Sequence, residues 1–197
     1  PIHCPVPLVL TLHDIIFLEP RQGGNRSWYQ NMGWYYRRMV VPRILSQCEK
    51  IITVSHFECN RIREALQLPK DKITAIYNGY SEHFRPLSET LSITRKYIDD
   101  DDYIFFLGNT DPKKNVARTL KAYSLYLKQS DKKRPLLIAD LSKDKLDAIL
   151  REQQIEEIKP YLSYPGYIPN KDLAYLYNGA FVFLYTSLRE SFGIPML

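Results

Sequence analysis

The sequence lacks the features that mark several large classes of protein. No apolar run approaches the roughly 18 residues that a membrane-spanning helix needs, so no spanning segment is expected. The 13 prolines and eight glycines are spread along the chain, which shows no low-complexity stretch and no repeat of solenoid period. No secretory signal is visible. We therefore expect a soluble globular protein, with attachment to a membrane surface as the alternative.

Motifs that hold cofactors are absent as well. The sequence has no Gly-x-Gly-x-x-Gly pattern, no Walker loop and no His/Cys cluster with metal-ligand spacing, so neither a metal nor another cofactor is expected. Without a clustered basic stripe or zinc spacing, nucleic acid is not an expected partner. Three cysteines, Cys4, Cys48 and Cys59, have no metal or redox spacing, which is typical of reduced thiols in a cytosolic protein.

The composition is ordinary for a globular protein, and the charge is moderately basic. The 27 Lys and Arg against 22 Asp and Glu give a net charge of +5. Such a surface suits phosphate-bearing ligands, anionic lipid or nucleic acid and does not choose among them. A solvated basic surface explains the charge equally well.

Short apolar runs alternate with helical patterns along the chain. The runs are continuous, as in strands that are buried on both faces of a parallel sheet. Helical stretches at 114–128, 142–154 and 170–178 separate the later runs, and each opens on or near a polar capping residue. Strand–helix alternation predicts an α/β fold with parallel sheets. The predicted strands are 8–12, 51–54, 73–76, 103–107, 136–139 and 181–185.

Turn signals near residue 80 predict a boundary between two α/β units, 1–85 and 86–197. The first unit has only three candidate strands, few for an independent domain. The acidic run 99–102 before the fourth strand is expected to be a solvated loop.

Ligands of open α/β sheets bind beyond the carboxyl ends of the strands. The segment GNTDPKKN follows the strand at 103–107, and Gly108 there would let backbone approach a ligand. Lys113 and Lys114 precede a helix whose positive end disfavours cations, so an anion such as phosphate between them would explain their place. Two solvated lysines in a turn are the alternative.

Two further strand ends carry candidate residues. In RESFGIPML, Gly193 and Pro195 suit a helix start whose amides could hold an anion, and Glu190 could meet a sugar hydroxyl. The alternative for Glu190 is a favourable charge at a helix start. His13 follows the first strand, where it is either an acid–base or substrate-contacting group or a structural residue.

The segment RSWYQNMGWYYRRMVVPRIL mixes aromatic residues and arginines. Such a mixture could form a membrane-surface helix. Arg37, Arg38 and Arg43 do not form one stripe, however, and Pro42 is expected to interrupt the helix. A structural role is the favoured interpretation.

Together these stretches resemble glycosyltransferase family 4, the group 1 glycosyltransferases of the two-domain GT-B fold. The matching stretches span nearly the whole chain in the family order: LTLHD, KIITVSHFECNRI, ITAIYNGYSEHFRP, YIFFLGNTDPKKNVARTLKAYS and YPGYIPNKDLAYLYNGAFVFLYTSLRESFGIPML. The family signature places a second Glu eight positions after Glu190, at position 198. The resemblance thus implies two Rossmann-like units, both incomplete: residues 1–85 from the acceptor-side domain and 86–197 from the nucleotide-sugar domain.

The resemblance also implies residue roles. Lys114 would clamp the diphosphate of the sugar donor, with Lys113 in support, and Glu190 would hold the hydroxyls of the transferred sugar. His13 would reach that sugar from the first domain. The remaining sugar-donor contacts implied are Gly108, Asn109, Gly166, Tyr167, Ile168, Ser191, Phe192 and Gly193. Asn109 stands where the family often has Arg, Thr186 where it often has Pro, Ser191 where it often has Gly, and Asp140 where it often has Gly.

The implied activity is retaining, metal-free transfer of a sugar from a nucleoside-diphosphate sugar to a hydroxyl of a glycan or lipid-linked acceptor, in surface glycan assembly. The implied location is cytoplasmic, with peripheral contact to the inner face of the membrane as an option. Two alternatives remain open: a non-catalytic nucleotide-binding fragment and a GT-B-like sugar-nucleotide epimerase.

Overall fold

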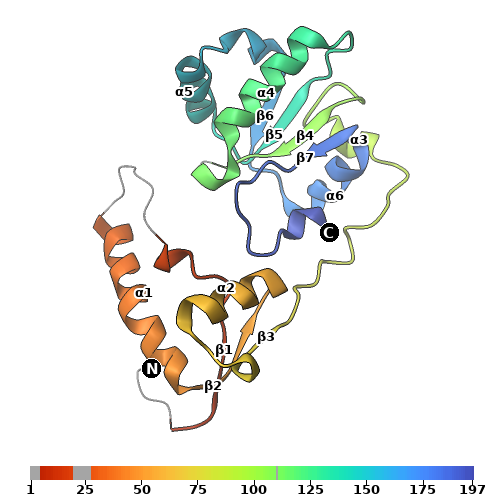
Figure 1. Ribbon diagram of the computed structural model, residues 1–197. Coiled ribbons are helices and arrows are strands. Elements are labelled where there is room, and N and C mark those ends of the chain that lie inside the picture. The colour runs from red at the N-terminus through yellow and green to blue at the C-terminus, as the bar shows by residue number, and fades with distance from the viewer. Residues whose placement is uncertain (1–4, 20–27, 110) are drawn as a thin grey trace. The chain divides into compact units, whose positions relative to one another are not determined.

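The computed structural model describes residues 5–19, 28–109 and 111–197, so Cys4 lies outside the described residues. Its contacts divide the chain into two compact units. The first comprises residues 1–79 with 191–195 and 197, and the second comprises residues 80–190 with 196. Figure 1 traces the chain through both units. The sequence placed the boundary at 85/86, whereas the contacts change at 79/80 and return residues 191–195 to the first unit.

The first unit is built on a three-stranded parallel sheet in the order β1-β2-β3. One face is covered by the helices α1 and α2, whose buried residues Leu45 and Ile62 meet Ile51 and Ile73 of the sheet. Half-buried and exposed residues alternate along β1, as expected of a strand with one covered face. The elements are β1 (Leu8–Thr11), α1 (Trp28–Gln47), β2 (Cys48–Thr53), α2 (His56–Leu66) and β3 (Ile73–Ala75), with 3-10 turns at Ile16–Leu18 and Lys70–Lys72.

The second unit is built on a four-stranded parallel sheet in the order β6-β5-β4-β7. Its strands are β4 (Ile104–Leu107), β5 (Leu136–Ala139), β6 (Leu162–Gly166) and β7 (Val182–Leu184). Its helices are α3 (Leu91–Thr94), α4 (Val116–Gln129), α5 (Lys143–Gln153) and α6 (Asn170–Gly179). Short 3-10 segments lie at Pro112–Lys114 and Glu156–Tyr161, and a further one at Ile194–Met196 follows the last strand.

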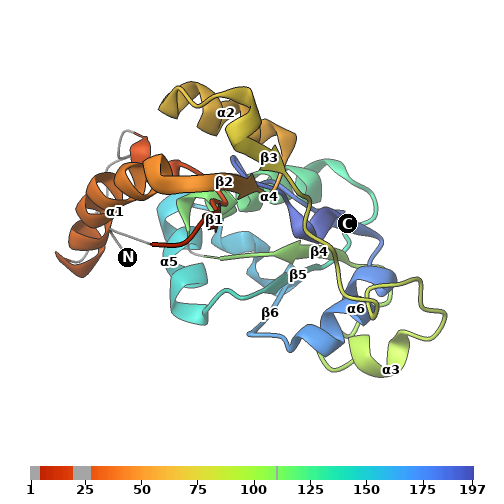
Figure 2. The same ribbon diagram turned by 90° about the horizontal axis from the view of Figure 1, so that it is seen from below.

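Helices cover both faces of the second sheet (Figure 2). On one face, Phe106 and Ile138 pack against α4 and α5 in a single apolar cluster. On the other face, Phe105 and Leu137 pack with α6 and with Ile98, which follows α3. This two-sided burial explains why β4 and β5 appear in the sequence as continuous apolar runs.

The predicted α/β fold with parallel sheets is confirmed, and the six predicted strands all form, with small shifts of their ends. The helix α4 turns one apolar stripe toward the core, because Val116, Leu120, Tyr123 and Leu127 are all buried. The sequence missed β6, whose letters LSYPG include Pro165 and Gly166. The strand lies at the edge of the sheet, where a proline is tolerated because no neighbour needs its N–H.

The expected break at Pro42 is wrong, because α1 continues through it to Gln47. A proline inside a helix removes one backbone hydrogen bond. Beyond Pro42, however, Leu45 is buried and Ile44 packs against the same core. Their burial favours continuation of the helix, since each large apolar side chain removed from water contributes about 1.5–3 kcal/mol.

The expected loop at 99–102 forms, with residues 99–101 exposed and Asp102 partly buried. Its carboxylate accepts a hydrogen bond from Nε of Arg134 at 2.6 Å and forms an ion pair with Lys132. The guanidinium of Arg134 also lies 3.7 Å from the ring centroid of Phe181. These contacts tie the start of β4 to the turn before β5.

Candidate functional site

Gly108 follows β4 directly and is buried. Its amide donates to the carbonyl of Ala139 at 2.9 Å. A Cβ atom on Gly108 would lie 3.0 Å from Cγ2 of Ile138 and 3.1 Å from that carbonyl oxygen. Close packing of the loop against β5 therefore requires a glycine here, whether or not a ligand also approaches.

The two lysines of the loop lie in the 3-10 segment Pro112–Lys114, just before α4. Asp111 begins this turn, and its carboxylate accepts from the amide of Lys113 at 3.0 Å. The same carboxylate group lies 3.8 Å from the ammonium of Lys113. The loop is further fixed because the carbonyl of Lys113 accepts from the amide of Leu188 at 2.7 Å. The lysines are thus held beside the segment that follows β7.

Asn115 stands at the start of α4, but its side chain makes no capping hydrogen bond to the helix. Its backbone is left-handed, with φ of 60°, a conformation that asparagine tolerates better than most residues. The side-chain amide donates instead to the carbonyl of Thr186 at 3.2 Å. The hydroxyls of Thr119 and Thr186 add a second link, at 2.6 Å. Both bonds join α4 to the chain beyond β7.

These links bring Lys114 and Glu190 together from positions 76 residues apart. The ammonium Nζ of Lys114 donates to Oε1 of Glu190 at 2.8 Å, and the two side chains are only 17% and 23% exposed. Burial opposes ionisation of Glu190, but hydrogen bonds from Lys114 and Ser187 outweigh it and hold the pKa of the carboxyl below its ordinary value. Glu190 is therefore a carboxylate at neutral pH.

The ring of Tyr185 lies beside this ion pair. Its ring centroid lies 5.9 Å from the ammonium of Lys114, within range of a cation–π contact. Burial, together with the charge of Glu190, raises the pKa of Tyr185 to about 12, so the phenol stays neutral. Tyr185 was not predicted as a site residue because it falls within the predicted strand 181–185. β7 ends at Leu184, so Tyr185 lies just beyond the strand end, where ligands of such sheets bind.

The segment after β6 divides into residues with different surroundings. Gly166 has φ of 82°, which favours glycine, and its carbonyl accepts from the amide of Asp140 at 2.8 Å. Tyr167 is 77% exposed, whereas Ile168 is 2% exposed and packs in the core. Tyr167 is thus free to meet a ligand with its side chain, and Ile168 could do so only through its backbone.

The other predicted site residues belong to the first unit, except Asn109, which belongs to the second. The segment 191–195 groups there, where the carbonyl of Ser191 accepts from Oγ of Ser55 at 2.7 Å and its own hydroxyl donates to Asp14 at 3.3 Å. The ring of Phe192 lies 5.6 Å from that of Tyr77. His13 is exposed after β1, and Asn109 uses its side-chain oxygen to accept from the amide of Asp111. Gly193 has φ of 86° at the start of the last 3-10 turn.

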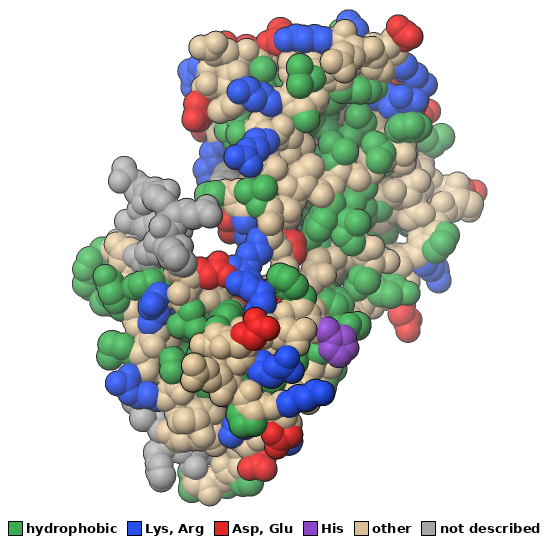
Figure 3. All heavy atoms as spheres, viewed as in Figure 1, with side chains coloured by type: hydrophobic (Ala, Val, Ile, Leu, Met, Phe, Trp, Pro, Cys, Tyr) green, Lys and Arg blue, Asp and Glu red, His purple; other side chains and the backbone are tan. Residues whose placement is uncertain are grey.

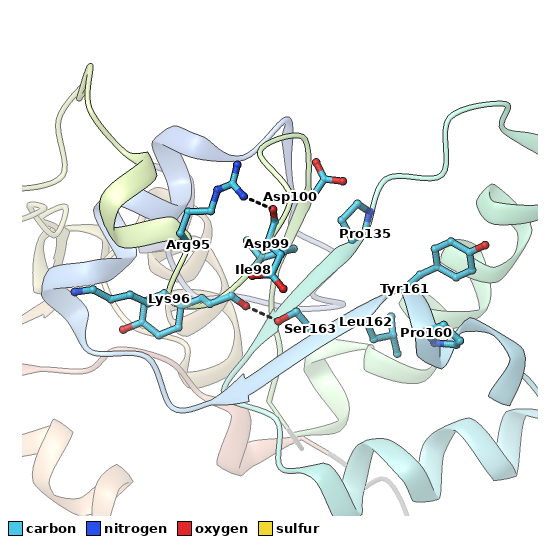
Figure 4. A pocket seen from close by; sticks show the side chains of 11 residues that line it. Arg95, Lys96, Ile98, Asp99, Asp100, Pro135, Pro160, Tyr161, Leu162 and Ser163 are labelled. Atoms are coloured by element: carbon cyan, nitrogen blue, oxygen red, sulfur yellow. Dashed lines mark hydrogen bonds between the residues drawn. The ribbon is translucent and has the colours of Figure 1, made fainter.

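A separate hollow of about 510 Å³ lies at the opposite edge of the second sheet (Figure 4). Its lining includes Pro135 and Leu162, which lie where β5 and β6 begin. Its polar groups are bonded to one another, since Arg95 donates to the carbonyl of Asp99 and Ser163 to that of Tyr97. The candidate site therefore stays at the carboxyl edge, around Lys114 and Glu190.

In the described ranges of the chain, no group of three or more His, Cys, Asp or Glu side chains lies close enough to hold a metal ion. None of the helices in the same ranges is long and apolar enough to cross a membrane.

Solved structures of the GT-B fold share this arrangement. Sucrose-phosphate synthase from Thermosynechococcus elongatus matches with a TM-score of 0.70 at 17% identity, over 95% of this chain and 46% of that one. HepE from Anabaena, solved with UDP and glucose, matches with a TM-score of 0.64 at 17% identity, over 95% of this chain and 48% of that one. At such low identity these matches establish the fold.

Curated relatives extend the likeness to sequence. O-antigen chain mannosyltransferase B of Escherichia coli is 29% identical over 193 residues, which cover 96% of this chain and 49% of that protein. The serotype-specific mannosyltransferase WbdA of Escherichia coli is 26% identical over 204 residues, covering 98% of this chain and 24% of that protein. The chain thus spans half or less of the length of these two relatives.

Family models match both parts of the chain. The model described as Glycosyltransferase Family 4 matches residues 2–83. The model described as Glycosyl transferases group 1 matches residues 91–197, more than half of the chain and all of the Lys114–Glu190 region. The chain therefore belongs to the group 1 glycosyl transferases.

Proposed function

We propose that this chain carries the sugar-donor site of a retaining glycosyltransferase. The enzyme would move a sugar from a nucleoside-diphosphate sugar to a hydroxyl of a glycan or lipid-linked acceptor. The observation that carries the proposal is the pairing of Lys114 with Glu190 at 2.8 Å, beyond the carboxyl ends of β4 and β7. A cation and a carboxylate side by side suit a substrate that has a diphosphate next to a sugar.

Each residue has a chemical task in this proposal. As the bond between the sugar and the diphosphate breaks, negative charge grows on the departing diphosphate. The ammonium of Lys114 and the first amides of α4 stabilise that charge. The carboxylate of Glu190 accepts hydrogen bonds from sugar hydroxyls and so fixes the sugar. The acceptor oxygen forms the new bond on the same face, and its proton leaves with the diphosphate.

Lys114 supplies positive charge where a divalent cation would otherwise be needed, so we also propose transfer without a metal ion. Both relatives are named as mannosyltransferases, one of them of the O-antigen chain. This favours mannose as the transferred sugar and a bacterial surface glycan as the product.

The metal-free transfer has a simple test, since added EDTA should leave the rate of transfer unchanged.

The first test is calorimetric titration of the chain with GDP-mannose, UDP-glucose and the corresponding diphosphates. Lys114→Ala should weaken binding of the preferred ligand by about 10-fold or more, since a charge-assisted contact contributes about 1.5–3 kcal/mol. Lys159→Ala is the matched control. Lys159, in the 3-10 segment Glu156–Tyr161, also forms an ion pair, with Asp147 of α5 at 2.6 Å. Equal loss in both variants would contradict the role of Lys114.

The second candidate function is nucleotide binding without catalysis, in which Lys114 beside Glu190 would hold the diphosphate but no sugar would be transferred. Incubation of the chain with a labelled nucleotide sugar and an oligomannoside acceptor separates the two. Labelled product would exclude the binding-only function. Binding without product would support it, and exchange of sugar epimers without acceptor would favour an epimerase.

We further propose that α1 contacts the inner face of a membrane in the cytoplasm, where a lipid-linked acceptor would be found. Its buried face packs in the first core through Leu45 and its neighbours, but large apolar side chains also line an exposed face (Figure 3). Positions 28, 32, 35 and 39 repeat every three or four residues and so share one side of the helix. The exposed large apolar residues of α1 are Trp28, Tyr29, Met32, Tyr35, Tyr36 and Met39.

Sedimentation with vesicles tests this contact. The chain should bind vesicles containing anionic phosphatidylglycerol, and the double substitution Trp28→Ser/Met32→Ser should reduce the bound fraction several-fold. Leu125→Ser is the control, since Leu125 is an exposed apolar residue on α4 in the other unit. Equal binding by both variants would contradict a role for α1.

A further inference from the structure

We propose that Glu190 makes the site discriminate between an intact nucleotide sugar and the nucleoside diphosphate left after transfer. It does so by competing with the diphosphate for Lys114. The inference rests on the proposed function, because it assigns the site a preference for substrate over product. It adds a specificity role to a residue whose proposed contact is with the sugar.

The ammonium group of Lys114, which would bind the diphosphate, already forms an ion pair. The ammonium of Lys114 is 2.8 Å from Glu190, and Asp111 lies 3.8 Å from the ammonium of Lys113. The side chains of Lys114 and Glu190 are 17% and 23% exposed. Those of Lys113 and Asp111 are 40% and 47% exposed. Charges in the less exposed pair are screened less by water, so their attraction is the stronger of the two.

An incoming diphosphate must therefore take Lys114 away from Glu190. A part-buried carboxylate that loses its charged hydrogen-bond donor is costly unless new donors replace it. An intact nucleotide sugar brings such donors, its sugar hydroxyls, to the carboxylate. A nucleoside diphosphate has no transferred sugar, so it brings no sugar hydroxyls to this carboxylate, and it adds its own negative charge beside Glu190. The ion pair thus weakens binding of the product more than binding of the substrate, which favours product release.

The experiment compares wild-type chain with Glu190→Gln, using calorimetry at low ionic strength. The probes are inorganic pyrophosphate, GDP and GDP-mannose. Glutamine keeps the shape and can still accept from a hydroxyl, but it no longer neutralises Lys114. We expect the variant to bind pyrophosphate and GDP about 3- to 5-fold more tightly, and GDP-mannose no more tightly. Asp147→Asn, which breaks the Lys159 ion pair, should leave all three affinities unchanged.

A double-mutant cycle shows whether Glu190 acts through Lys114. In a Lys114→Ala background, Glu190→Gln should change pyrophosphate affinity less than twofold, or binding should be undetectable in both proteins. If Glu190→Gln strengthens binding by the same factor with and without Lys114, the carboxylate acts by general repulsion and the inference is wrong. An equal gain for GDP and GDP-mannose would also overturn it, as would failure of wild type and Glu190→Gln alike to bind pyrophosphate.

These results separate the inference from the proposed function. Sugar transfer with an unchanged pyrophosphate affinity in Glu190→Gln would refute the inference and leave the transferase function standing. A gain in pyrophosphate affinity that requires Lys114, without transfer of any sugar by wild type, would support the competition and refute the transferase function of the chain.

Discussion

Replacement of Gly108 by alanine tests the packing that places the lysine loop. The new methyl carbon would lie 3.0 Å from Cγ2 of Ile138 and 3.1 Å from the carbonyl oxygen of Ala139. Both distances are shorter than the usual 3.5–4.0 Å between carbon atoms in contact. The methyl of Ile138 could move a little, but the Ala139 carbonyl belongs to β5 in the middle of the sheet.

Two effects of opposite sign determine how much Gly108→Ala changes the free energy of unfolding. An extra methyl in a well-packed region destabilises by about 1–3 kcal/mol. Alanine also restricts the unfolded chain, which stabilises by about 0.4–1 kcal/mol where the native backbone suits it. Gly108 is not among the residues with positive φ, so this gain applies. We expect a net loss of about 1–2 kcal/mol in the free energy of unfolding, because the carbonyl of β5 cannot give way.

Urea unfolding can assign the loss to one unit. The only two tryptophans of the sequence, Trp28 and Trp34, lie in α1 of the first unit, so tryptophan fluorescence follows that unit. Far-ultraviolet circular dichroism follows both units. Gly108→Ala should lower the midpoint of the dichroism transition by about 0.5–1 M urea and leave the fluorescence midpoint in place.

Gly79→Ala is the control for the substitution itself. No atom lies within 4 Å of a Cβ placed on Gly79, which belongs to the first unit. It should therefore leave the dichroism midpoint of the second unit unchanged. If Gly108→Ala were as stable as wild type, the close approach of the loop to β5 would be wrong, and with it the packing reason for glycine.

Two further predictions concern single contacts. The hydroxyl of Ser55 accepts a hydrogen bond from the amide of Glu58 at 3.1 Å and so caps α2. Ser55→Ala should therefore lower the free energy of unfolding of the first unit by about 1 kcal/mol. Tryptophan fluorescence during unfolding measures this, and an unchanged free energy would contradict the cap. Hydrogen bonds from Lys132 and Arg134 lower the pKa of Asp102. The stability that this gives is complete above the ordinary carboxyl pKa of about 4 and is lost as the pH falls through the folded value. As the pH falls from 5, the free energy of unfolding of Asp102→Asn, measured by dichroism, should thus decrease less than that of wild type. An identical pH dependence would refute this role of Asp102.

Much of the fold was accessible from local sequence. The runs at 104–107 and 136–139 are apolar throughout because each strand is covered on both faces, and this pattern needs no knowledge of the partner segments. Local rules failed where packing outweighs them. Pro42 sits inside α1 because Ile44 and Leu45 are needed in the core, and β6 tolerates Pro165 because it is an edge strand.

The candidate site divides in the same way. From the sequence alone, Lys114 and Glu190 each follow a strand and so belong to the carboxyl edge of a sheet. Their separation along the chain, however, hides that they form an ion pair at 2.8 Å. Strand order decides this, because β7 pairs with β4 rather than with its sequence neighbour β6 and so brings its loop beside the lysines.

The sequence by itself determined that this chain is an α/β protein with two parallel sheets, and it determined which loops carry polar side chains at the strand ends. Hydrophobic periodicity and capping residues depend on neighbours a few positions away, so they can be read locally. Only the tertiary structure decided that Asn115 holds Thr186, that Ile168 points into the core and that the charge of Lys114 is compensated by Glu190. Those contacts depend on which strands pair, and strand pairing is set by the burial of the whole core.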